Sequence, residues 1–176
     1  MGASESKTQD TAQLSEVEKN LIRSSWEQAL KNKKVFGVNV FIKLFIQNPS
    51  SQDLFEQLRG IPLEDLKTHR KMKAHALRVM ASLNTLVEQI DEVEILTEMF
   101  NNVARTHVIH KVEKAHYDLL GQVLMEVFSE ELGAKFDSAT KGAWLKAYVI
   151  MENIILDKYA EIDKLATERS ESSLKG

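Results

Sequence analysis

The chain has 176 residues, of which 43% are hydrophobic and 28% charged, and it contains no cysteine. This length and balance suffice for the core of one domain, so disorder throughout is excluded. The lack of cysteine excludes disulfides, thiolate metal sites, iron–sulfur clusters and a cysteine nucleophile. The formal net charge of −3 argues against a nucleic-acid partner, and no apolar run approaches the roughly 20 residues of a membrane span.

The first part of the chain is predicted to form helices separated by polar or proline-containing breaks. Seven glycines and two prolines are too few for the turns of a many-stranded β fold, so we expect an all-α fold. Residues 1–13 lack a core pattern and are expected to be a flexible tail. Ser15 and Glu18 match a capping box and predict a helix start. A second helix is expected from about residue 33 to 47, stopped by Asn48-Pro49, because apolar residues recur at helical spacing: Phe36, Val40, Phe41, Leu44 and Phe45.

Four longer helices are expected in the rest of the chain. The first spans about residues 66–90 and is interrupted at Asp91-Glu92. The second ends near 109–111, the third ends before Gly133, and the last begins at Asp137 or Ser138. The second of these helices carries a stripe formed by Leu96, Met99, Val103 and His107. Because the sequence turns polar after about residue 165, we expect one domain over 14–162 and a flexible tail over 163–176.

Two of the five histidines stand out by their position. His69 and His116 are expected to face solvent, whereas His75 and His107 fall on the apolar stripes of their helices. His75 precedes Asp91 by 16 residues (91 − 75), and His107 follows it by 16 (107 − 91). If the helices fold back at Asp91, each histidine lies about 24 Å from the corner, at about 1.5 Å per residue. The two imidazoles would then face each other at the same height.

Three interpretations of this pair are open. Each histidine can be an ordinary core residue whose ring bonds a backbone carbonyl. A zinc site is a weaker reading, because zinc needs three or four ligands and no carboxylate on these faces completes the set. The neighbours Phe41, Phe55, Met72 and Val79 instead suggest a flat apolar prosthetic group, and haem iron offers two axial positions to a pair of histidines.

The chain resembles the globin family over about residues 14–162, and within that family the neuroglobin, cytoglobin and globin X groups. The resemblance lies in Trp26, in Pro49 followed six residues later by Phe55, in His75 followed by Val79, and in His107. The strings His75 to Met80, Leu83 to Thr85 and His110 to Glu113 are close to those of cytoglobins. The connection from His107 to Tyr117 is one residue shorter than in cytoglobins and closer to the neuroglobin pattern.

This resemblance implies a globin fold of six to eight helices around haem b. His107 would be the proximal iron ligand and His75 the distal histidine, binding either the iron or the bound gas. Phe55 would stack on the porphyrin and Phe41 line the distal side. The complete set of implied haem-contacting residues is Phe41, Phe55, Met72, His75, Arg78, Val79, Val103, His107, His110 and Val112, with Val103 and Val112 on the proximal side and Arg78 and His110 near the propionates.

The implied function is reversible dioxygen binding by an intracellular, cytoplasmic haem protein that also takes carbon monoxide and nitric oxide. Its role would be oxygen storage, transport or sensing, and the likeness to neuroglobins and cytoglobins favours six-coordinate iron with His75 as a ligand. An alternative is a haem redox enzyme, a nitric-oxide dioxygenase or nitrite reductase served by an external reductase, or an electron-transfer protein at a membrane surface. A haem-free interaction module is a third reading. Nothing in the sequence selects a monomer or a homodimer.

The amino terminus matches a lipidation motif. Residues 1–6, Met-Gly-Ala-Ser-Glu-Ser, fit the N-myristoylation pattern M-G-x-x-x-[ST] on Gly2, and an unmodified polar tail is the alternative. Some globins of the globin X group carry such an acylated start. Because Lys7 is the single nearby basic residue and no cysteine is available for a second acyl chain, the motif predicts at most weak, reversible contact with a membrane.

Overall fold

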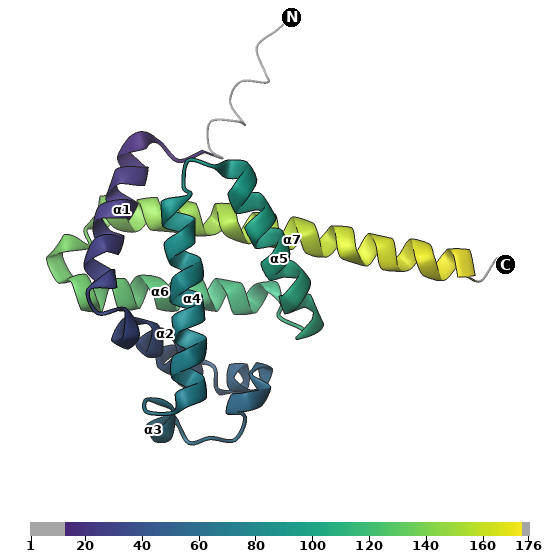
Figure 1. The fold of residues 1–176 in the computed structure, drawn as a ribbon, viewed down its shortest axis with the longest axis horizontal. Coiled ribbons are helices and arrows are strands. Elements are labelled where there is room, and N and C mark those ends of the chain that lie inside the picture. Colours follow the sequence, from purple (N-terminus) through teal and green to yellow (C-terminus); the bar gives the residue numbers. More distant parts are fainter. Residues whose placement is uncertain (1–12, 174–176) are drawn as a thin grey trace, which may run out of the picture.

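The chain folds into helices packed around one apolar core (Figure 1). The computed structural model describes residues 13–173, with side chains to residue 170, and this part contains seven α-helices, three short 3-10 helices and no strand. The all-α prediction is therefore confirmed. The elements are α1 (Glu16–Leu30), α2 (Lys33–Gln47), η1 (Pro49–Leu54), η2 (Glu56–Leu58), α3 (Leu63–Leu66), α4 (Arg70–Glu88), α5 (Val93–Ile109), α6 (Lys114–Leu132), η3 (Gly133–Lys135) and α7 (Ser138–Ser173).

The first two helices follow the sequence signals closely. The Ser15 hydroxyl accepts a hydrogen bond from the Glu18 amide at 3.3 Å, and the Glu18 carboxylate accepts one from the Ser15 amide at 2.7 Å. Helix α2 has the predicted bounds, and its five predicted core residues are all buried. Asn48 is extended, with φ −139° and ψ 90°, because the residue before Pro49 is excluded from the helical region.

The region before α4, the helix that carries His75, differs from the prediction. We expected one helix from about residue 66, but α3 is a separate turn and α4 begins at Arg70. His69 between them has an extended backbone, with ψ 129°. Leu66 in α3 is completely buried, so this turn is anchored by its own contact with the core rather than as the first turn of α4.

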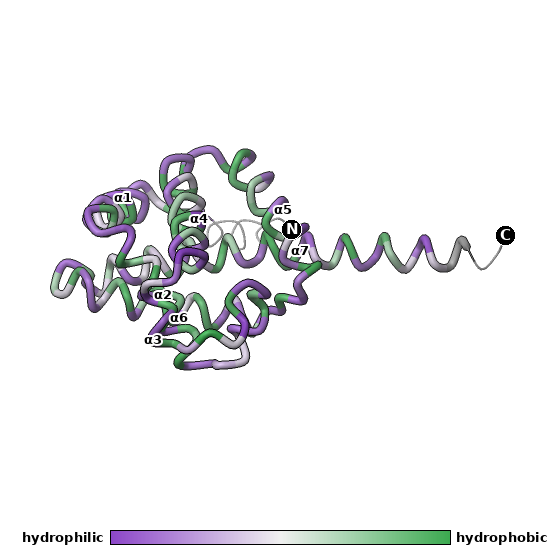
Figure 2. The backbone as a smooth tube through the Cα atoms, turned by 60° about the horizontal axis from the view of Figure 1, so that its bottom comes forward, coloured by the Kyte–Doolittle hydropathy of each residue, from purple (hydrophilic) through white to green (hydrophobic). Residues whose placement is uncertain are grey.

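The last helix is longer than predicted. Helix α7 continues to Ser173 and projects beyond the body of the protein (Figure 1), so residues 163–173 of the expected flexible tail are helical. Its sequence is polar but rich in good helix formers, with no glycine or proline between Gly142 and Gly176. Figure 2 shows hydrophilic and hydrophobic residues interspersed along the projecting part. Within residues 13–173 no helix is both long and apolar enough to cross a membrane.

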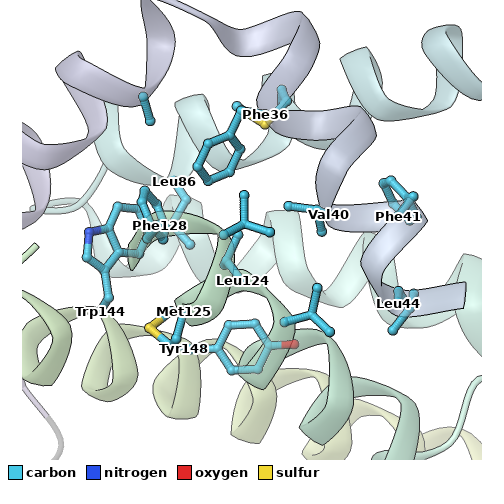
Figure 3. Packing of buried hydrophobic residues seen from close by; sticks show 14 of the residues in the cluster. Phe36, Val40, Phe41, Leu44, Leu86, Leu124, Met125, Phe128, Trp144 and Tyr148 are labelled. Carbon is cyan, nitrogen blue, oxygen red and sulfur yellow. The ribbon is translucent and has the colours of Figure 1, made fainter. Parts of the chain in front are cut away.

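Aromatic side chains form much of the core, and Figure 3 shows Phe36 of α2, Phe128 of α6 and Trp144 of α7 gathered there. The Trp144 and Phe128 ring centroids lie 4.6 Å apart, and Trp26 lies 5.8 Å from Trp144. The Trp144 indole N–H donates to the Ser25 hydroxyl at 2.8 Å, so this buried polar atom is satisfied. This cluster fixes α1, α6 and α7 relative to one another.

The α4–α5 corner is tied to α1 by charge. Asp91 pairs with Lys19 at 2.8 Å and also with Arg23. The chain changes direction in this corner, after which α4 packs against α2 and α5 packs against α7 (Figure 1). His75, in the second turn of α4, and His107, in the last turn of α5, line a common cleft.

Candidate functional site

His75 and His107 line one cleft of about 340 Å³. His75 comes from α4, His107 from α5, and the third wall is the segment from Leu54 to Leu58. The side chains at its exposed rim include three basic residues, Lys71, Arg78 and His110. The predicted pairing of the two histidines is consistent with this shared cleft, and we call it the outer cleft.

A second, apolar cleft of about 130 Å³ continues inward from His107. His107 lines both spaces, and the inner cleft is otherwise walled by side chains of α2, α4, α5, α6 and α7. Its aromatic members are Phe41, Phe100, Tyr117 and Tyr148. Together the two clefts form a slot that is apolar inside and basic at the rim.

His75 is held as a neutral imidazole. Its ring is 4.7 Å from the Phe41 ring and 4.9 Å from the Phe55 ring, in edge-on contacts. Burial is the largest cause that lowers the pKa of His75 to about 4, and electrostatic interactions with Arg78 and His107 contribute to the same shift. No hydrogen bond joins its ring to another residue in the described part of the chain. A neutral, unbonded imidazole can bind a metal or donate its N–H to a ligand.

His107 is oriented by its own helix. Its Nδ1 donates to the Val103 carbonyl at 2.9 Å, because a carbonyl oxygen can only accept, and the Thr106 hydroxyl lies 3.3 Å from the same nitrogen. Burial lowers the pKa of His107, although the Val103 bond opposes that effect. With the proton on Nδ1, Nε2 keeps a free lone pair. In metal-binding histidines, a hydrogen bond from one ring nitrogen to a carbonyl oxygen commonly fixes the tautomer and leaves the other nitrogen free for the metal.

The structure gathers nine of the ten predicted residues around the slot. The outer cleft includes Phe55, His75, Arg78, His107, His110 and Val112, and the inner cleft includes Phe41, Val79, Val103 and again His107. Met72 is the exception, because it is completely buried in the core and lines neither cleft.

Sequence reasoning missed part of the inner wall and misjudged two other histidines. Phe100 is buried where the predicted stripe used Met99. Met99 and Phe100 both fit a helical stripe that includes His107. Phe100 lies seven residues before His107, which is about two turns of helix, and this spacing could have placed Phe100 on the same face as His107. His69 and His116 are half-buried rather than solvent-facing, and the His116 Nδ1 accepts from the Glu113 amide at 3.0 Å at the start of α6.

The donor set and the shape of the slot fit a haem. Among the described residues no group of three or more His, Asp or Glu side chains is placed to hold a metal ion directly. The slot offers two imidazoles that line the same cleft, aromatic walls for a flat ring, and basic side chains at the exposed rim for acidic groups. An all-α chain with such a slot has the features of a haem protein.

Comparison with known proteins identifies the family. The family model described as Globin matches residues 38–155. The chain is 31% identical to Cytoglobin-1 of Oryzias latipes over 85% of each chain, and 30% identical to Cytoglobin-1 of Danio rerio over 88% of this chain and 91% of the relative. It is 29% identical to Neuroglobin of Danio rerio over 84% of this chain and 94% of the relative.

The chain belongs to the globin family. Its cofactor is haem b, and it is a haem-based protein that binds diatomic gases such as dioxygen. The predictions of family, fold and cofactor are confirmed.

Proposed function

We propose that this globin binds dioxygen reversibly and that His75 competes with the gas for the iron. The observation that carries the proposal is the state of His75: neutral, without a hydrogen bond to the described residues, and confined between Phe41 and Phe55 in the cleft that His107 shares. Haem supplies the iron to which the gas binds, and the protein determines which groups reach its two axial faces.

The hydrogen bond of His107 supports the assignment of one histidine to each side of the haem iron. Its Nδ1 bond to Val103 holds the ring with Nε2 free, so we assign His107 as the permanent ligand. His75 has no such fixed bond to residues 13–170, so its ring is free either to bind the iron or to move aside for the gas. When the ring moves aside, its N–H can donate to a polarised gas ligand.

Competition by His75 has a quantitative consequence. If the histidine occupies the iron in most molecules, the apparent affinity for gas falls by the fraction of open sites. A hydrogen bond from His75 acts in the opposite direction. A bond to a charged acceptor contributes about 1.5–3 kcal/mol, which is roughly tenfold to hundredfold in affinity.

Rapid-mixing kinetics with carbon monoxide test this proposal. In the ferrous protein we expect a rate that levels off at high carbon monoxide concentration, because dissociation of His75 then becomes limiting. His75→Leu should give five-coordinate ferrous spectra and a rate that rises linearly with concentration. His110→Leu is the matched control, since His110 lines the same cleft at the exposed rim and should leave the saturation intact.

A linear rate in the unmodified protein, together with an unchanged spectrum in His75→Leu, would contradict the competition. Dioxygen release tests the other part of the proposal. If His75 stabilises the gas, His75→Leu should release dioxygen roughly tenfold to hundredfold faster once coordination differences are corrected. Irreversible oxidation of the iron by stoichiometric dioxygen, without a stable gas complex in either protein, would contradict reversible binding.

A further inference from the structure

A third cleft of about 240 Å³ lies at the α4–α5 corner, away from the histidines. Most of its lining residues are apolar, and they come from the end of α4, the start of α5 and the middle of α7, with Leu86, Ile90, Leu96 and Ile150 among them. We call it the corner cleft. Phe100 and Met151 line both this cleft and the inner cleft, so they form the wall between the two.

The charged groups of the corner cleft are already paired. They are Lys19 and Asp91, which bond each other at 2.8 Å. Lys19 also bonds Glu16 at 2.8 Å, and Asp91 also bonds Arg23. The cleft therefore offers an apolar interior without a free charge to attract a polar ligand. Its chemistry fits a hydrocarbon chain.

The described chain begins at this cleft. Gln13 and Leu14 both line it. Gly2 precedes Gln13 by 11 residues (13 − 2), and residues 1–12 lie outside the described part. A segment of that length can span up to about 36–40 Å when extended, so a group attached to Gly2 can reach the cleft by folding back.

The amino-terminal motif supplies such a group. After removal of Met1, the free amine of Gly2 attacks the carbonyl of a long-chain acyl thioester, which forms an amide and releases the thiol with the amine proton. The adjoining residues give the acylated tail little attraction for a membrane. Residues 2–12 contain one basic residue, Lys7, against Glu5 and Asp10. A single myristoyl chain without a basic patch binds membranes only marginally.

We propose that the corner cleft holds the acyl chain of myristoylated Gly2. Most molecules then keep the chain against α4, α5 and α7, and a minority expose it to a membrane. Membrane partitioning falls by the fraction of molecules with the chain exposed. The acyl chain would therefore be a reversible membrane anchor that binds in the corner cleft when it is not in a membrane.

Nuclear magnetic resonance locates the chain directly. The full-length protein is produced together with an N-myristoyltransferase and ¹³C-labelled myristate, loaded with haem, and studied as the diamagnetic ferrous carbon monoxide form. We expect mass spectrometry to show one acyl adduct and the labelled chain to show nuclear Overhauser contacts to methyl groups of Leu86, Ile90 and Ile150. An unmodified amino terminus overturns the proposal, and so does an acylated protein without these contacts.

Vesicle binding tests the consequence with a matched pair of variants. Ile150 lines the corner cleft, whereas Val149 beside it on α7 is 50% exposed and does not. On neutral phosphatidylcholine vesicles, acylated Ile150→Glu should bind roughly tenfold more than the acylated parent, as expected when a docked fraction of about nine-tenths is released. Acylated Val149→Glu, with the same change of charge, should bind like the parent.

Equal binding by both variants and the parent overturns the proposal. The Soret spectrum and far-ultraviolet circular dichroism of each variant serve as controls for folding. If Ile150→Glu does not fold, Ile154→Glu replaces it, because Ile154 is another half-buried member of the cleft lining. The resonance contacts of the parent protein decide the question independently of either variant.

Discussion

Replacing Gly121 by alanine should destabilise the protein through its contact with Tyr148. A Cβ at Gly121 would lie 2.7 Å from Cε1 and 2.9 Å from Cδ1 of the Tyr148 ring, closer than real Cβ atoms approach. That ring is 8% exposed, and its hydroxyl donates to the Tyr117 carbonyl at 2.7 Å. The ring must therefore move, and the buried hydrogen bond is strained or lost with it.

The magnitude follows from three contributions. Overpacking costs about 2 kcal/mol, and leaving the Tyr148 hydroxyl and the Tyr117 carbonyl unpaired costs about 2 kcal/mol more. Alanine in place of glycine within a helix returns about 1 kcal/mol. We therefore expect Gly121→Ala to lower the free energy of unfolding by about 3 kcal/mol, the balance of these three terms.

Urea unfolding of the haem-loaded proteins, followed by far-ultraviolet circular dichroism, measures this change. Gly142→Ala is the matched control, because Gly142 lies in α7 with nothing within 4 Å of an added Cβ. The control should be stabilised by roughly 0.5–1 kcal/mol. The reasoning is refuted if the two variants unfold at the same urea concentration, because then the Tyr148 ring does not constrain position 121.

Two further predictions concern stability. Glu18→Gln should cost about 0.5–1 kcal/mol near pH 7, because the Ser15 amide and then Lys146 hold the pKa of Glu18 below its usual value by favouring the charged carboxylate. A lowered folded-state pKa stabilises the protein above the unfolded value of 4.5 and loses that effect as the pH falls through the folded value. The difference in unfolding free energy between Glu18→Gln and the parent should therefore vanish in urea titrations at acid pH. A difference that stays the same below pH 4.5 would show that the charge of Glu18 is not its cause. Trp144→Phe should cost about 2–4 kcal/mol, because it removes the 2.8 Å bond to buried Ser25 and leaves a small cavity; thermal unfolding checks this, and an unchanged midpoint would contradict it.

Much of the helical framework could be predicted because its signals are local. The capping box of Ser15 and Glu18, the Pro49 stop and the apolar spacing within α2 each act over a few residues. The pairing of His75 with His107 was predictable for a different reason. Each lies 16 residues from Asp91, so both lie about equally far from the corner between α4 and α5, and they line a common cleft.

The remaining features depend on contacts between distant segments. The separate turn α3 exists because Leu66 has its own place in the core, which helical spacing does not reveal. Phe100 rather than Met99 lines the inner cleft. The spacing of apolar residues along a helix does not distinguish between two adjacent apolar residues. Tyr148 reaches the inner cleft from α7, so its role depends on how α6 and α7 pack. The lining of the corner cleft likewise comes from four separate helices and residues before α1.

The most direct test of the account is haem uptake by His107→Gly in the presence and absence of free imidazole. The parent protein should take up one hemin per chain with a sharp Soret band, and His107→Gly should bind it far more weakly. Free imidazole should restore the band, because it replaces the missing ligand in the vacated space while the rest of the slot is intact. A His107→Gly protein that binds hemin as tightly as the parent, with the same spectrum, would contradict the central assignment of His107 to the iron.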